Sequence, residues 1–195
     1  MLLFAHTGIT FGLAFAWDKG LSKHIPPLNN RAHSQALATT IRKIDYRLVL
    51  LGSMLPDIID KPLGHIFLAE TFHNSGRIFA HTLLFFLILF LFGSYRWWRS
   101  RKTGFLVLAL ASGWHLILDG MWRNTQTLYW PFHGWSFRKG SYVDWWEWIS
   151  TLHENMQTDP AIYTAEAAGL LILATFGLNL LRDKRVFDFL KTGFA

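Results

Sequence analysis

The sequence contains no cysteine and few charged residues. Without cysteine there is no disulfide framework and no thiolate chemistry, so any metal would have to be held by histidines and carboxylates. The charged fraction of 16% lies far from disordered or soluble acidic compositions. In place of charge, the chain has a hydrophobic fraction of 51%, with 10 tryptophans and 17 phenylalanines. This composition favours a membrane protein, and the length predicts a single domain over residues 1–195.

Four apolar stretches are long enough, or nearly so, to cross a hydrocarbon layer, which takes about 20 residues. They lie at residues 2–17, 78–94, 103–118 and 161–181. A fifth stretch, residues 48–59, is short and ends in acids, so its length also fits a buried helix or a half-span. We therefore predict an all-α integral membrane helix bundle with about four to five transmembrane helices plus interfacial segments.

Basic residues predict the orientation, because short cytoplasmic loops retain Lys and Arg. They cluster in residues 19–47, 96–102 and 182–191. All three clusters can face the cytoplasm if the chain crosses an inner or plasma membrane five times, with the N-terminus outside and the C-terminus cytoplasmic. Residues 60–77 and 119–160 then lie on the outer side. The net charge of +6 is thus a topology signal, and we expect no nucleic-acid partner because no binding motif accompanies it.

Ionisable residues near or inside membrane helices are costly to place there and by default indicate function. In the predicted topology, one set of such residues converges at the outer ends of several helices. Spacings of three or four residues put the members of each sequence pair on one face of a helix. The set consists of His6, Asp57, Asp60, Arg77, His81, His115 and Asp119.

Imidazoles and carboxylates are ligands of zinc and manganese, and helices that each deliver one or two of them can build a metal site in a bundle. We expect one or two divalent ions, zinc or manganese, bound by His6, Asp57, Asp60, His81, His115 and Asp119. Such an ion lowers the pKa of its bound water toward about 7. The planar fork of Arg77 suits an anionic oxygen. Asp60, Arg77 and His115 are the residues that we expect to act in catalysis.

A simpler reading exists for each residue alone: an interfacial histidine, or an aspartate in a turn. The shared location favours a site, because otherwise several charges would be buried without a common purpose. Glu166, inside the last apolar stretch, is expected to make a polar contact within the bundle. Weaker candidates for a site are the remaining histidines His24, His33, His65, His73, His133 and His153.

Four motifs, LGSMLPDIIDKPLG, GRIFAHTLLF, HLILDGMW and TLYWPFHGW, together resemble the YdjM-like family (LexA-binding, inner membrane-associated) of metal-dependent hydrolases. The family pattern has an early His, G-x-x-x-P-D, R-x-x-x-H-[ST], H-x-x-x-D and a later W-P. The resemblance covers residues 6–131 and implicates the seven residues above, with Trp130 and Pro131 marking the last element. Gly76 and Ala80 depart from it, because many members have His and Thr there, and the two acids are separated by two residues rather than one. These departures leave the number of ions open.

The resemblance and its likeness to zinc-dependent phospholipase C imply a phospholipase-like hydrolase. We expect an outward-facing metal site that cleaves a phosphoester or related ester of a membrane lipid or lipid-linked substrate. The alternative is a non-catalytic membrane protein that binds a regulatory partner through its basic cytoplasmic segments. A transporter would need polar residues that continue toward the cytoplasmic side, and the run LLFFLILFLF provides none. The sequence names neither the substrate nor the oligomeric state.

Overall fold

The computed structural model describes residues 3–20, 44–140 and 145–194. Within these ranges the chain is all helical, as predicted, and has no strand. The basic segment between residues 21 and 43, which includes His24 and His33, lies outside the described residues. The elements in chain order are η1 (Ala5–Ile9), α1 (Thr10–Lys19), α3 (Tyr46–Pro62), η3 (Leu63–Phe67), α4 (Leu83–Ser100), α5 (Gly104–Leu118), η4 (Met121–Arg123), α6 (Thr125–Leu128), α7 (Trp145–Thr158), α8 (Pro160–Arg182) and α9 (Val186–Thr192).

The predicted number of membrane spans is not confirmed. Among the described helices, only α8, with 23 residues, is long and apolar enough to cross a membrane. Helix α5 has 15 residues, and at about 1.5 Å per residue it is shorter than a hydrocarbon core of about 30 Å. The stretch predicted at residues 78–94 begins later as a helix, because Thr82 caps α4 by accepting the Phe85 N–H through Oγ1 at 3.0 Å.

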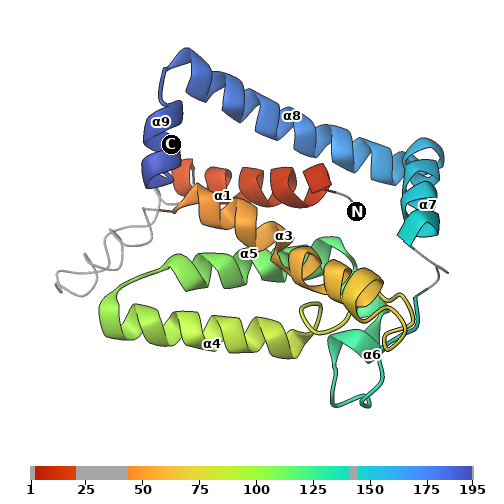
Figure 1. Ribbon diagram of the computed structural model, residues 1–195. Coiled ribbons are helices and arrows are strands. Elements are labelled where there is room, and N and C mark those ends of the chain that lie inside the picture. The colour runs from red at the N-terminus through yellow and green to blue at the C-terminus, as the bar shows by residue number, and fades with distance from the viewer. Residues whose placement is uncertain (1–2, 21–43, 141–144, 195) are drawn as a thin grey trace.

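The long helices run roughly lengthwise through the molecule (Figure 1). Helices α3 and α5 pack against each other, α5 also packs on α4, and η1 packs on α8. The C-terminal ends of α1, α4 and α8 lie together at one end of the molecule, on the left of Figure 1. Basic residues, including Arg99, Arg101 and Arg182, lie at these helix ends. The end of α5 and the starts of α4 and α8 lie at the opposite end.

An apolar cluster at one end of the bundle and a hydrogen bond at the other hold its helices together. Near the basic end, Phe11, Tyr46, Val49, Leu180 and Phe189 form an apolar core between α1, α3, α8 and α9. Near the other end, the Glu166 carboxylate on α8 accepts the Phe4 N–H at 2.9 Å, at the start of η1. This bond satisfies one of the open N–H groups of a helix start, and it confirms the polar contact expected of Glu166.

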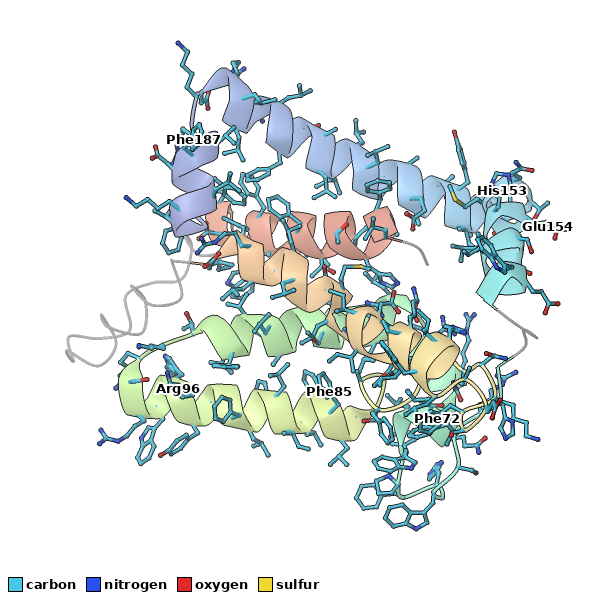
Figure 2. All side chains as sticks on the ribbon, viewed as in Figure 1. Phe72, Phe85, Arg96, His153, Glu154 and Phe187 are labelled. Carbon is cyan, nitrogen blue, oxygen red and sulfur yellow. The ribbon has the colours of Figure 1, made fainter. Side chains whose placement is uncertain are left out.

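Large apolar side chains remain exposed along the outer faces of the long helices (Figure 2). On α4 these include Ile88 and Leu91, which are 60% and 64% exposed. On α8 they include Leu171 and Leu178, which are 67% and 66% exposed. Contiguous exposed apolar surface of this kind indicates contact with a membrane or a partner.

Two glycines bring η1 and α8 into backbone contact. A Cβ added to Gly8 would overlap the backbone of Gly169, and a Cβ added to Gly169 would overlap the backbone of Phe4. Small residues at a helix crossing let the backbones approach closely. The close crossing fixes the position of η1 against α8, and therefore the position of His6, which η1 carries.

We expect Gly169→Leu to push α8 away from η1. Overpacking of this kind costs about 1–3 kcal/mol of stability, and the variant should also lose metal affinity because His6 moves. Gly177→Ala on the same helix is the matched control, since its added Cβ meets nothing within 4 Å. Thermal unfolding and metal titration of the detergent-purified protein measure both effects. A Gly169→Leu variant that unfolds at the wild-type temperature would contradict the close crossing.

Candidate metal centre

Five of the predicted ligands lie together at the end of the bundle opposite the basic clusters. They come from four parts of the chain: η1, α3, the turn before α4, and the end of α5. All five side chains are at most 6% exposed. They are His6, Asp57, His81, His115 and Asp119.

These residues form two overlapping groups of possible ligand atoms, and the atoms of each group lie within 4.8 Å of one another. The first group is His6, His115 and Asp119, and the second is Asp57, His81 and His115. His115 is therefore shared by both groups.

The first group is formed where η1 packs against the end of α5. His6 Nε2 lies 3.0 Å from Asp119 Oδ1, and the His6 ring stacks on the His115 ring with centroids 4.0 Å apart. His6 Nδ1 is buried and has no hydrogen-bond partner in the described part of the chain. The π-helical turn that carries His6 is a form that occurs frequently at functional sites.

The second group contains two imidazoles whose tautomers are fixed by the oxygen atoms that their Nδ1 atoms contact. His115 Nδ1 lies 2.6 Å from the Ser53 carbonyl oxygen, which can only accept, so this nitrogen donates. His81 Nδ1 lies 2.7 Å from Asp60 Oδ2 and donates to that carboxylate. Both Nε2 atoms of the neutral rings therefore carry lone pairs. They face each other at 3.3 Å, and Asp57 Oδ1 lies 3.5 and 3.7 Å from them.

Two opposed lone pairs need a cation between them. The candidates are a metal ion and a proton. Burial alone lowers the pKa of His81, but hydrogen bonds with Asp57 and Asp60 outweigh burial and raise its pKa overall. The same negative environment favours a divalent cation. Metal-bound histidines ordinarily donate their other ring N–H to a carboxylate or a carbonyl, and both histidines do so here. The residues present therefore fit a metal ion.

Asp60 differs from the expected ligands in how its oxygens are used. It is fully buried, and it accepts the backbone N–H groups of Ile78, Ala80 and His81 at 2.8, 2.9 and 3.1 Å. The His81 ring N–H is its fourth donor. These bonds fix the turn before α4 and orient the His81 ring. Asp60 contributes no atom to either group of ligand atoms found among the described residues.

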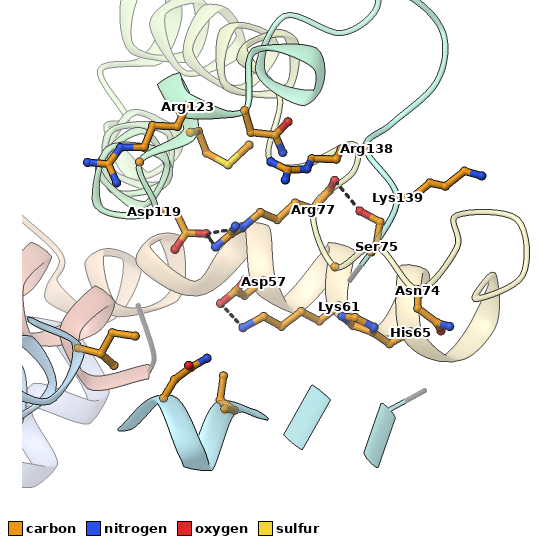
Figure 3. A pocket seen from close by; sticks show the side chains of 18 residues that line it. Asp57, Lys61, His65, Asn74, Ser75, Arg77, Asp119, Arg123, Arg138 and Lys139 are labelled. Atoms are coloured by element: carbon orange, nitrogen blue, oxygen red, sulfur yellow. Dashed lines mark hydrogen bonds and ion pairs between the residues drawn. The ribbon is translucent and has the colours of Figure 1, made fainter. Parts of the chain in front are cut away.

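Arg77 lies at the border between the metal site and a cavity. Its Nε and Nη2 both contact Asp119 Oδ2 at 2.8 Å (Figure 3). The Arg77 side chain is 46% exposed. Burial alone raises the pKa of Asp119, but the hydrogen bond with His6 and the charge of Arg77 outweigh it and hold that pKa well below its usual range. Asp119 is therefore an anion, as a metal ligand must be.

The cavity has a volume of about 460 Å³, within the range of about 300–1,000 Å³ typical of small-molecule sites. The predicted topology puts all of its cationic lining residues on the outer side, but of these only Arg77 was predicted to act in the site. One of these cations, Lys61, does have a local sequence signal, because it follows Asp57 by four residues and pairs with it at 2.6 Å. Cations that arrive on distant loops leave no such signal. The ionisable side chains that line the cavity are Asp57, Lys61, His65, Arg77, Asp119, Arg123, Arg138 and Lys139.

The weaker histidine candidates differ in whether they lie at the cavity. Of the four that the structure describes, His65, His73, His133 and His153, only His65 lines the cavity. A Cβ added to Gly76 would overlap the His65 ring, so His65 fills the room that a side chain at position 76 would need. His153 lies on the outer side of α7 (Figure 2). Trp130 packs against Phe79 and Phe137 beside the cavity.

A family model described as YdjM inner membrane protein matches residues 1–186. No curated protein and no solved structure matches the chain.

Proposed function

The chain belongs to the YdjM family of inner membrane proteins, and from this premise we propose that it is a metal-dependent membrane hydrolase. The observation that carries the proposal is the pair of opposed Nε2 atoms of His81 and His115, 3.3 Å apart in a fully buried site beside Asp57. Each ring is held by a partner behind it, which is the arrangement that orients histidine ligands.

The two groups of ligand atoms limit how ions can bind. A histidine Nε2 has one lone pair, so His115 serves one ion at a time. One ion would take His81, His115 and Asp57. A second ion, if bound, would rely on His6 and Asp119 without His115. Nitrogen and oxygen ligands without sulfur suit zinc or manganese. Asp60 would act as a positioning residue for His81.

The proposed reaction is hydrolysis of a phosphoester, or a related ester, of a lipid or lipid-linked substrate. A bound divalent ion would supply a water whose pKa is lowered toward about 7. Arg77 has the planar fork that matches phosphate oxygens, and its partly exposed side chain lines the cavity. The membrane family and the exposed apolar helix faces support a substrate that enters from the lipid.

We also propose a multi-pass protein with the metal site on the outer side of the membrane. The arrangement in Figure 1 supports this topology, because the basic ends of α1, α4 and α8 lie opposite the metal site. Short cytoplasmic loops retain such positive charge.

Metal analysis and lipid hydrolysis by the purified protein test the proposal. Stoichiometric zinc or manganese should be present. A chelator should abolish release of product from a lipid phosphoester, and the added metal should restore it. A wild-type protein that binds no divalent ion would overturn the proposal.

Arg77→Gln should lower kcat/KM by roughly 100-fold, which is typical for loss of one donor to a developing oxyanion. It should keep most of the metal, because the ligand atoms remain. Arg77→Lys should recover part of the activity through its charge, although it lacks the fork. Arg99→Gln, at the basic end of the molecule, is the matched control. Unchanged kcat/KM in Arg77→Gln would remove Arg77 from the reaction.

A further inference from the structure

The cavity beside the metal site carries more positive charge than its acids use. Five cationic side chains and two carboxylates line it. Asp57 already pairs with Lys61, and Asp119 with Arg77. Three positive charges remain, and a divalent ion would add two. An occupant with a single negative charge would leave most of this field uncompensated.

The three remaining cations are Arg123, Arg138 and Lys139. Within the described ranges, no carboxylate pairs with any of them. In the view of Figure 3 they lie along the upper side of the cavity, while Asp57 and Lys61 lie below. Arginine and lysine that line one cavity without counter-ions are typical of sites for phosphate groups.

The loop that carries two of these cations, residues 137–140, is held in place. Gly140 N–H donates to the His73 carbonyl oxygen at 3.0 Å. Gly140 also packs so closely against the Asn74 backbone that an added Cβ would overlap it. At the other end of the loop, Phe137 packs against an aromatic cluster of Phe72, Phe79 and Trp130. Arg138 and Lys139 are therefore presented from a fixed wall.

The lining of the cavity also includes three apolar side chains, Met121, Leu152 on α7 and Ile162 on α8. Among the described helices, α8 is the one that is long and apolar enough to cross a membrane. An occupant with a charged headgroup and an apolar chain could therefore place the chain toward α7 and α8.

We propose that the substrate is a lipid diphosphate. The inference rests on the proposed function and names the headgroup. Arg77 and the metal site hold the terminal phosphate, Arg138 holds the second phosphate, and Arg123 and Lys139 add positive charge along the cavity. Attack of water on the terminal phosphorus forms a P–O bond and breaks the bridging P–O–P bond. The bridging oxygen leaves with the lipid monophosphate, inorganic phosphate is the other product, and the proton lost by the water passes to solvent.

Binding to the metal-free, full-length protein in detergent isolates the contribution of the cations and prevents turnover. The probes are inorganic phosphate, methylenediphosphonate as a free diphosphate, and farnesyl diphosphate as a lipid diphosphate, each measured by calorimetric titration. The test variant is Arg138→Gln combined with Lys139→Gln. The control is Arg99→Gln combined with Lys102→Gln, two exposed cations at the basic end of the molecule.

The wild type should bind methylenediphosphonate roughly tenfold more tightly than phosphate, since each hydrogen bond to a charged group contributes about that much. Farnesyl diphosphate should bind more tightly still. The test variant should lose the preference for diphosphate and keep its affinity for phosphate, and the control variant should keep both. Equal affinities in the wild type, or an unchanged preference in the test variant, would overturn the proposal. Equal binding of the two diphosphates would overturn its lipid part.

Failure of the proposed function is visible separately. A wild-type protein without bound metal, but with the diphosphate preference that the test variant lacks, would overturn the hydrolase and leave the diphosphate site. Normal metal binding together with equal affinities for phosphate and diphosphate would overturn the diphosphate site and leave the metal-dependent hydrolase.

Discussion

Replacing His115 with alanine is expected to leave the purified protein with almost no bound metal. His115 is the one residue that both groups of ligand atoms share among the described residues. Its ring is fully buried and is locked by the bond from Nδ1 to the Ser53 carbonyl. Loss of an outer partner of a ligand typically weakens metal affinity by about 10–100-fold. Loss of the shared ligand itself should therefore cost more than that.

The result must be separated from simple unfolding. His115→Gln keeps much of the buried volume but cannot reproduce the imidazole, so it should lose metal while remaining folded. His153→Ala is the matched control, because His153 is exposed on α7 and its side chain forms a hydrogen bond with Gln157 of the same helix. Mass-spectrometric metal analysis and thermal unfolding report the two properties independently. Stoichiometric metal in both His115 variants would show that the ion, if any, binds elsewhere.

The sequence could predict which residues come together at the site, but not which of their atoms contact each other. Charge asymmetry between the loops placed His6, His115 and Asp119 at the same helix ends, and the structure brings them together. Spacing says which face of a helix a residue occupies. It does not say which oxygen of a carboxylate meets a backbone N–H from another segment. The role of Asp60 depends on the turn at residues 78–81, which no periodic pattern describes.

The lengths of the helices and the cationic wall of the cavity were also beyond the sequence pattern. Apolar composition marked residues 78–94, but the cap at Thr82 moves the helix start past His81. That shift places His81 in a turn, where Asp60 can reach its ring and its backbone. Arg138 and Lys139 reach the cavity because Gly140 bonds to His73, which lies 67 residues earlier in the chain. Such long-range contacts are set by packing and leave no local signal.

Asparagine substitution should affect mainly metal binding at Asp57 and mainly stability at Asp60. Asp57 is a ligand candidate whose other oxygen pairs with the partly exposed Lys61. Asp57→Asn should therefore weaken metal binding strongly and destabilise the metal-free protein less than Asp60→Asn does, because the Lys61 ammonium that pairs with Asp57 is partly exposed and can turn toward water, whereas the donors to Asp60 are buried.

Asp60→Asn replaces one acceptor oxygen with an amide that can only donate, opposite backbone N–H groups that also donate. Unsatisfied buried groups cost about 1–3 kcal/mol each, so the metal-free protein should lose about 3–5 kcal/mol. For a chain of this length, that loss lowers the midpoint of thermal unfolding by on the order of 10 °C. Thermal unfolding of the metal-free variants measures the difference in stability, and zinc titration measures the difference in metal affinity. If Asp60→Asn unfolded like the wild type while Asp57→Asn unfolded early, the ligand and positioning roles would have to be exchanged. The contrast is decisive because both substitutions remove one negative charge from the same buried site and differ only in what each oxygen contacts.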